Sequence, residues 1–168
     1  RFGHTAIRIT DEATNVDIVY NYGAFDFATP NFVGKFAKGD LQYFATSESY
    51  PEFVMQYQYE QRSIVEQELD MTNAQKQSLF DELNRVLTSS KGTYTYKFID
   101  KNCTNMAVDI INKTLGSKAI VKRDNLHFTY RETLFPFFDG KKKKKLGTSI
   151  ISGTKVDQQA TLVFLPIE

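Results

Sequence analysis

The chain has 168 residues, and its 21 Lys or Arg and 20 Asp or Glu residues give a formal net charge of +1. This balance argues against a protein that binds nucleic acid through bulk positive charge. Hydrophobic residues make up 41% of the chain and aromatic residues 14%, which excludes a disordered composition. We expect a single globular domain over residues 1–168, long enough to bury a core without a disulfide or a metal.

The few ligand-forming side chains limit the chemistry that the chain can carry. Cys103 is the only cysteine, which excludes an intrachain disulfide, and His4 and His127 leave few ligands for a zinc site. The sequence contains no glycine-rich phosphate loop, no serine nucleophile motif and no apolar run of about 18 residues that could span a membrane. We therefore expect neither a metal nor an organic cofactor.

The first half of the chain alternates between strand and helix patterns. Residues 3–10 and 16–22 are β-rich and flank the turn-forming sequence DEATN, which predicts an antiparallel hairpin. His4 and Asn21 lie near the open end of this hairpin. After the break at Pro30, the pattern predicts a helical turn at 32–39, a strand at 41–48, a helix at 50–61 and a strand at 62–70.

Two amphipathic helices are the clearest elements of the second half. One begins after Thr72, whose hydroxyl can form a capping box with Gln75 before apolar residues recur every three or four positions. The other is predicted over residues 103–115 and ends at Gly116 as its C-cap. Residues 93–98, between the two helices, alternate as a strand.

The pattern weakens toward the C-terminus. Residues 129–138 predict a short helix stopped by Pro136, and residues 160–166 predict a closing strand. The five lysines at 141–145 are typical of a solvated loop, and their alternative role is attraction to anionic lipid headgroups. Together the elements predict an α+β domain with an antiparallel sheet packed against helices.

Cys103 is the strongest candidate for a catalytic residue. Asp100 or Asn102 can cap the helix whose first turn contains it, which places the sulfur beside backbone N–H groups that lack helical partners. A thiol in such a place has a lowered pKa, and a neighbouring imidazole lowers it further and serves as base and acid in acyl transfer. The alternative is a structural thiol, because Cys103 lies on the apolar face of its helix.

His4 is the candidate partner of the thiol, because the glycine before it allows close approach of another backbone or of a substrate. His127 lies in a weakly patterned segment and is the lesser candidate. A neutral imidazole needs a neighbour that fixes its tautomer, and the paired strand offers Asn21, with Tyr20 or Tyr22 as alternatives. The hairpin register decides among them, since a shift of one residue exchanges the two faces of the hairpin.

Several segments, in order along nearly the whole chain, resemble the periplasmic N-terminal domain of the bacterial lipoprotein N-acyltransferase family called Lnb. The GHT, NYGxFDF and NC[ST] blocks are specific to this family when they occur in combination. The similar segments are FGHTAIRI (2–9), YNYGAFDF (20–27), PNFVGKFAKGDLQY (30–43), QRSIVEQELDMT (61–72), YKFIDKNCTN (96–105), TYRETL (129–134) and FLP (164–166).

The resemblance implies a fold similar to the papain-like (NlpC/P60-like) thiol hydrolases in permuted order, with the histidine strand before the cysteine helix. It implies that Cys103 accepts an acyl chain from a phospholipid as a thioester, which the α-amine of a diacylglyceryl-cysteine lipoprotein then receives. His4 would act as general base and then acid, Asn21 would orient the imidazole, and backbone N–H groups around Cys103 would form an oxyanion hole. The resemblance also implies a periplasmic protein that is membrane-associated at full length, since family members carry membrane-spanning helices after this domain.

Two other functions fit the same residues. In a papain-like cell-wall amidase or peptidase, water would replace the amine as acceptor, and the cleft would be polar and extended. In a non-catalytic module the domain would only bind lipid or lipoprotein, with Cys103 sealed in the core or beyond hydrogen-bonding reach of an imidazole. An apolar groove leading to Cys103 would favour the acyl donor over a peptide.

Overall fold

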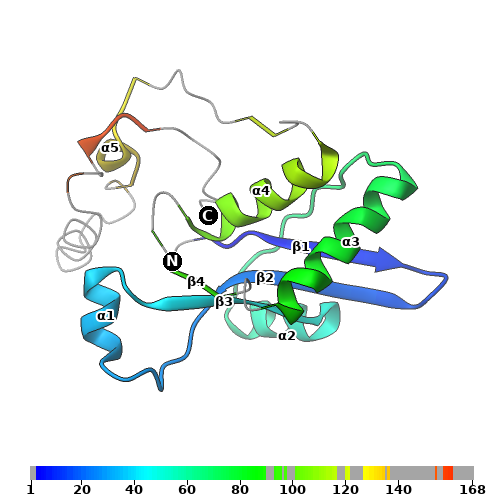
Figure 1. Ribbon diagram of the computed structural model, residues 1–168, viewed down its shortest axis with the longest axis horizontal. Coiled ribbons are helices and arrows are strands. Elements are labelled where there is room, and N and C mark those ends of the chain that lie inside the picture. The colour runs from blue at the N-terminus through cyan, green and yellow to red at the C-terminus, as the bar shows by residue number, and fades with distance from the viewer. Residues whose placement is uncertain are drawn as a thin grey trace.

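The computed structural model describes residues 3–89, 93–95, 97, 101–116, 120–121, 127–134, 136, 154 and 157–160 (Figure 1). The lysine run at 141–145 lies outside the described residues, and so does the predicted strand at 160–166 except for its first residue, Ala160. Ala160 is buried, and its N–H donates to the Phe128 carbonyl at 2.8 Å.

A four-stranded antiparallel sheet forms the centre of the described part. Its strands are β1 (Ala6–Asp11), β2 (Val16–Ala24), β3 (Gln42–Ser49) and β4 (Thr93–Thr95), and they lie in this order across the sheet. β1 and β2 pair as the predicted hairpin, with Ala6 opposite Asn21. Asn15 adopts a φ of 53° in the connecting turn, which asparagine tolerates better than most residues. The α+β class and the antiparallel sheet are confirmed, whereas the permuted papain-like relationship stays a prediction.

The helices within the described residues are α1 (Phe32–Lys38), α2 (Tyr50–Tyr59), α3 (Asn73–Thr88), α4 (Cys103–Leu115) and α5 (Tyr130–Leu134). α3 begins with the predicted capping box, in which the Thr72 hydroxyl accepts the N–H of Gln75 and the Gln75 side chain accepts the N–H of Thr72. A second capping box, between Ser49 and Glu52, begins α2 and was not predicted from the sequence. These reciprocal bonds fix where both helices start.

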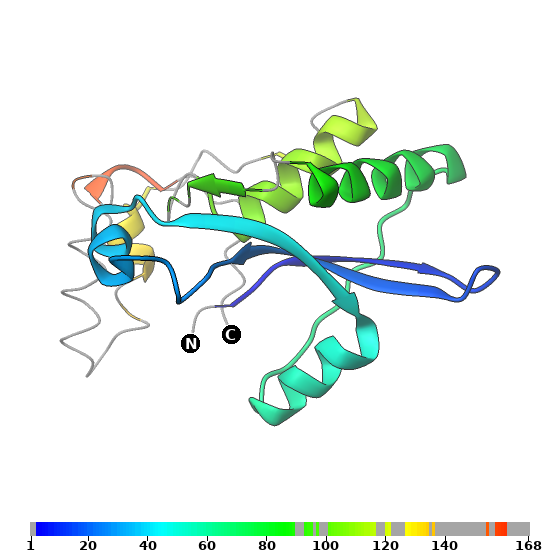
Figure 2. The same cartoon turned by 60° about the horizontal axis from the view of Figure 1, so that its bottom comes forward.

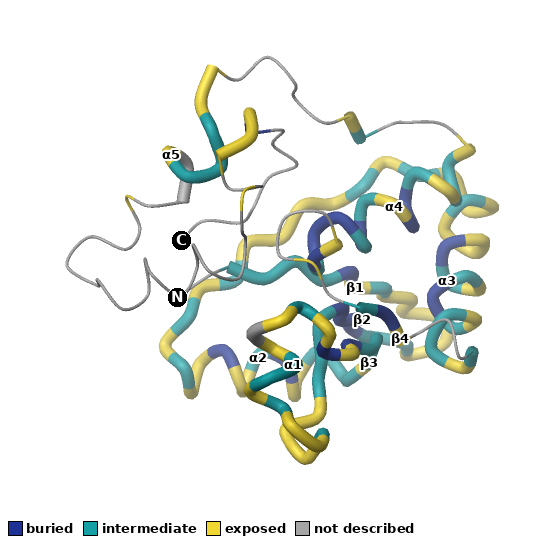
Figure 3. The backbone as a smooth tube through the Cα atoms, turned by 60° about the vertical axis from the view of Figure 1, so that its left-hand side comes forward, coloured by how far each residue is buried: buried dark blue, intermediate teal, exposed yellow. Residues whose placement is uncertain are grey.

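The sheet separates two layers of helices, with α3 and α4 over one face and α2 against the other (Figure 2). Buried residues recur along α3 and α4 (Figure 3), and their apolar members pack with strand residues in the main core. Side chains of β2 alternate between the two layers: Tyr20 and Tyr22 pack into the main core, and Val19 packs on the α2 side. By the same alternation, Asn21 lies on the α2 side.

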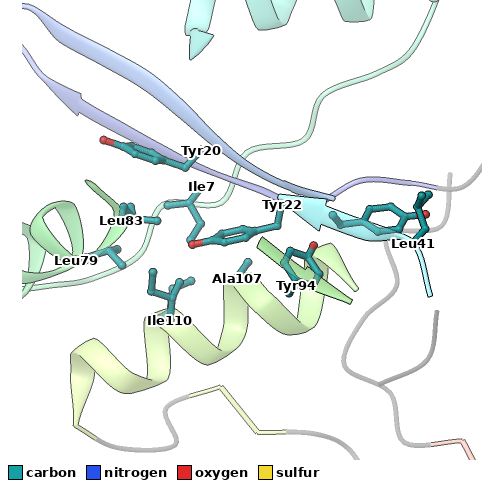
Figure 4. Packing of buried hydrophobic residues seen from close by; sticks show 11 residues of the cluster. Ile7, Tyr20, Tyr22, Leu41, Leu79, Leu83, Tyr94, Ala107 and Ile110 are labelled. Atoms are coloured by element: carbon teal, nitrogen blue, oxygen red, sulfur yellow. The ribbon is translucent and has the colours of Figure 1, made fainter. Parts of the chain in front are cut away.

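The main core fills the space between the sheet and the pair α3 and α4 (Figure 4). The Tyr20 hydroxyl reaches the edge of this core and donates to Asn84 Oδ1 on α3 at 3.0 Å. The apolar face of α4 packs inward as predicted, with Cys103 at its edge. The buried members of the core are Ile7, Tyr20, Tyr22, Leu41, Tyr43, Leu79, Leu83, Tyr94, Ala107, Ile110 and Ile111.

The strand predicted at 62–70 is wrong, because this segment is coil and pairs with none of the four strands. Its apolar residues still find partners on both layers. Ile64 packs on the α2 side and Leu69 packs against the main core. A coil segment can bury separate side chains without joining a backbone ladder, so the apolar pattern resembled that of a strand.

We predict that Leu83→Ala lowers the free energy of unfolding by about 2–5 kcal/mol, because truncation of this side chain leaves a cavity in the main core. Leu83 is 1% exposed. Val65→Ala is the matched control, since Val65 is 94% exposed and its truncation should change the free energy by less than about 0.5 kcal/mol. Urea unfolding followed by circular dichroism measures both. Equal midpoints for the two variants would contradict the assigned core.

Candidate functional site

Cys103 is the first residue of α4, as the capping pattern predicts. Asn102 caps the helix, and its Oδ1 accepts the backbone N–H of Asn105 at 3.0 Å; Asp100, the other predicted cap, lies outside the described residues. The N–H groups of Cys103 and Thr104 belong to the first turn, where helix geometry provides no carbonyl partner. The thiol therefore lies at the positive end of the α4 dipole, and Cys103 is half-buried rather than sealed in the core.

His4 and Asn21 meet on the α2 side of the hairpin, where His4 Nε2 lies 2.9 Å from Asn21 Oδ1. The register that pairs Ala6 with Asn21 explains this contact, because His4 shares the face of Ala6. The same register turns Tyr20 and Tyr22 into the main core on the opposite face. Of the three candidates for the tautomer partner, the structure brings Asn21 to His4.

The Cys103 thiol and the His4 imidazole lie beside each other and interact, which connects α4 with the segment that leads into β1. Because Nε2 faces Asn21, Nδ1 is the ring nitrogen left to face the sulfur. The neighbouring residues also join the two elements, since Thr5 Oγ1 and Thr104 Oγ1 are 2.8 Å apart. The structure thus brings all three predicted site residues together.

Opposing effects act on both ionisable groups of this pair. Burial raises the pKa of the Cys103 thiol and is the largest single effect, but the hydrogen bond and charge of His4, helped by the Thr5 N–H, outweigh it. The hydroxyl of Thr104 adds to this, and the pKa of the thiol lies below its ordinary value. Burial lowers the pKa of His4, but its hydrogen bonds and the charge of Cys103 raise the pKa above its ordinary value, against the positive charge of Arg62. Both shifts favour a thiolate paired with an imidazolium.

Glu48 on β3 belongs to the site and was not predicted from the sequence. Its Oε1 accepts an N–H of Asn21 Nδ2 at 2.8 Å. Val19 lies opposite Glu48 in the sheet register, so Glu48 is a diagonal neighbour of Asn21 on the same face. Only the pairing of β2 with β3 reveals this contact, because 27 positions separate the two residues in the sequence.

Other candidate ligands and elements lie apart from this site. His127 is exposed, and within the described segments no hydrogen bond joins it to Cys103. No cluster of three or more His, Cys, Asp or Glu side chains among the described residues could hold a metal ion. A search of those same residues for a helix that is long and apolar enough to cross a membrane finds none.

The fold and the site define a class of protein: an α+β domain in which a cysteine at a helix N-terminus lies beside a histidine that contacts an asparagine. The chain belongs to the family described as the Lnb N-terminal periplasmic domain, whose model matches residues 1–134. The match includes His4, Asn21 and Cys103, and it confirms the resemblance seen in the sequence. Among the curated proteins and the solved structures, none matches the chain.

We predict that iodoacetamide alkylates Cys103 with a pH midpoint below the value of about 8.5 that an ordinary thiol shows. His4→Ala should raise the midpoint above that of the wild type, because it removes the hydrogen bond and the positive charge that favour the thiolate while burial of the sulfur remains. His127→Ala is the matched control and should leave the midpoint unchanged. The rate of alkylation as a function of pH, followed by mass spectrometry, measures all three. The same midpoint in wild type and His4→Ala would show that the imidazole does not activate the thiol.

Proposed function

We propose that this domain carries out the acyl transfer of an Lnb-type lipoprotein N-acyltransferase. The observation that supports this most directly is the position of His4 between the Cys103 thiol and the Asn21 amide, in a chain that matches the family model. Cys103 is the proposed nucleophile, His4 the general base and then acid, and Asn21 the residue that orients the imidazole. The proposed acyl donor is a phospholipid, and the proposed acceptor is the α-amine of a diacylglyceryl-cysteine lipoprotein.

In the first half-reaction the Cys103 thiolate attacks the carbonyl carbon of a phospholipid ester. A carbon–sulfur bond forms, and the carbon–oxygen bond of the ester then breaks. The His4 imidazolium gives its Nδ1 proton to the departing alkoxide oxygen. The products are a lysophospholipid with a free hydroxyl and an acyl chain held on Cys103 as a thioester.

In the second half-reaction the α-amine of the lipoprotein attacks the thioester carbonyl. The His4 imidazole, now neutral, takes the proton that the amine loses as the carbon–nitrogen bond forms. The carbon–sulfur bond breaks, which regenerates the Cys103 thiolate beside the His4 imidazolium. The acyl chain ends as an amide on the lipoprotein, and the domain returns to its starting state.

Both half-reactions develop negative charge on the carbonyl oxygen of the acyl group. The N–H groups of Cys103 and Thr104 are the proposed donors to this oxygen, because they lie beside the thiol and have no helical carbonyl partner. Asn102 supports this assignment, since its cap bond engages the N–H of Asn105 and leaves the two earlier N–H groups unoccupied by the cap. The positive end of the α4 dipole adds to the same stabilisation.

We also propose that the fold is a permuted papain-like one. His4 precedes β1 and Cys103 begins α4, so the histidine comes before the cysteine in the chain. The cysteine helix packs its apolar face on an antiparallel sheet, and the thiol lies at the end of this helix. These features support the relationship that the family resemblance implies.

The proposed source of the phospholipid is the periplasmic surface of a membrane. An aromatic surface around α1 is the proposed contact with this membrane. Phe27 and Val33 are 75% and 76% exposed, and the Phe27 ring packs on Phe32 at 5.2 Å. Lys35 and Lys38 lie in the last turn of α1, where they can meet anionic headgroups. Two carboxylates also lie nearby: that of Asp26 accepts the N–H of Ala28 in its own turn, and that of Asp40 follows the helix.

We predict that phosphatidylethanolamine vesicles transfer one acyl chain to Cys103 of the wild-type domain. Cys103→Ser should give no adduct, yet it should stay folded, because first-turn N–H groups of α4 can bond the hydroxyl. His4→Ala should slow adduct formation by about 10²–10⁴-fold, the usual contribution of a general base or acid. Intact-protein mass spectrometry followed by peptide mapping measures the adduct, thermal melts test the fold, and His127→Ala is the control.

Other outcomes of this experiment identify the alternatives. Cleavage of cell-wall peptide by the wild type, without any acyl adduct, would replace the transferase with a papain-like amidase or peptidase. A folded protein that does neither would favour a domain that only binds lipid or lipoprotein.

We predict that the double substitution of Phe27→Ser with Val33→Ser weakens binding to vesicles of phosphatidylethanolamine and phosphatidylglycerol by about ten-fold or more, because two apolar side chains no longer insert among the lipids. Replacement of Tyr59 and Val65 by serine is the matched control, since these residues are 91% and 94% exposed elsewhere on the surface. Vesicle co-sedimentation measures both variants. Equal loss of binding in the two would show that the surface around α1 is not the contact.

A further inference from the structure

Glu48 is hydrogen-bonded to Asn21 of the site but has no part in the reaction proposed above. Its carboxylate accepts an N–H of Asn21 at 2.8 Å, and the oxygen of the same amide lies 2.9 Å from His4 Nε2. A continuous row of side chains therefore runs from Glu48 through Asn21 and His4 to the Cys103 thiol. Glu48 is half-buried, and it takes part in none of the ion pairs found within the described residues.

The direction of the Asn21 amide decides what His4 can do. With Oδ1 toward the ring, the amide accepts the Nε2–H of His4, which leaves Nδ1 to exchange its proton with the sulfur. A half-turn of the amide would present Nδ2–H to Nε2 instead, and two donors would then face each other whenever His4 is an imidazolium. An amide has nearly the same shape in both orientations, so packing alone distinguishes them poorly.

The carboxylate of Glu48 selects one of the two orientations of the Asn21 amide, because it can only accept hydrogen bonds. An ionised carboxylate only accepts hydrogen bonds, so it can face the NH2 end of the amide and not its oxygen. Asn21 is 8% exposed, so water contributes little to the choice. Glu48 is held in place by the sheet, since Val19 lies opposite it and the residue after it, Ser49, caps α2. The Glu48 carboxylate thus holds the Nδ2 end of the Asn21 amide, which leaves the Oδ1 end directed toward His4.

We propose that Glu48 is a positioning residue that fixes the Asn21 amide with its oxygen toward His4 and so keeps Nδ1 of the imidazole directed at the Cys103 sulfur. The inference rests on the proposed function only in using the same Cys103 and His4 pair. Among the described residues, Arg62, which follows α2, is the other charged group that acts on His4, and its positive charge opposes the imidazolium. The Asn21 oxygen is therefore needed to hold the protonated ring.

Substitution of Glu48 tests the proposal through the alkylation of Cys103 in the full chain. Glu48→Leu should raise the pH midpoint by about one unit and lower the rate below that midpoint about ten-fold, because the released amide can turn and oppose the imidazolium. Glu48→Gln should keep the rate within about two-fold of the wild type, since its carbonyl oxygen can accept the same N–H. Glu68→Leu, at an exposed glutamate, is the control. An unchanged midpoint in a folded Glu48→Leu variant would overturn the proposal.

A second comparison keeps the test decisive if Glu48→Leu does not fold. Asn21→Asp places a carboxylate against that of Glu48, and the repulsion between them should turn the new carboxylate away from His4 and so lower the alkylation rate of Cys103 about ten-fold. Adding Glu48→Gln should restore most of this loss, because the new amide can donate to the new carboxylate. A merely structural role predicts that Glu48→Gln has the same effect in both backgrounds, and that result would overturn the proposal. Alkylation needs no acyl donor, so a failure to form the acyl adduct would count against the proposed function and not against this role.

Discussion

The register of β1 against β2 is the constraint on which the site depends. Ala6 lies opposite Asn21, so His4 and Asn21 share one face of the hairpin while Tyr20 and Tyr22 enter the core on the other. The pairing that buries the tyrosines is therefore the same pairing that sets the imidazole beside the amide. The main core and the His4–Asn21 contact lie on opposite faces of one hairpin. A change of pairing by one residue would therefore disrupt both of them.

α4 provides the other half of the arrangement. Its apolar face, which includes Ala107 and Ile110, packs against the sheet and so decides where the helix begins. The Asn102 cap completes that beginning, and the contact of Thr104 with Thr5 joins it to the strand that follows His4. The thiol is thus placed by the start of a helix and not by a flexible loop, which suits its proposed role as a nucleophile at a fixed distance from His4.

The sequence predicted the parts of the structure that neighbouring residues determine. The capping box at Thr72, the C-cap at Gly116 and the apolar spacing on α4 are signals of this kind, and each is present as predicted. Contacts between strands were predicted only in part. The sequence favoured Asn21 as the partner of His4 but left Tyr20 and Tyr22 as alternatives, and it offered no sign of Glu48. Both contacts depend on sheet registers that no local pattern contains. The prediction of a strand at 62–70 was wrong for a related reason, since an apolar pattern does not indicate whether a partner strand exists.

The turn of the β1–β2 hairpin lies at the opposite end from the site, beyond the pair formed by Asp11 and Val16. Residues can be added to or removed from this turn during evolution without altering which side chains face the thiol. A single insertion inside either strand has a different effect, because it reverses the alternation over the part of the strand between the insertion and the site unless a bulge absorbs it. The hairpin therefore gives the domain one turn whose length is free to diverge, and two strands in which only paired changes keep His4 beside Asn21.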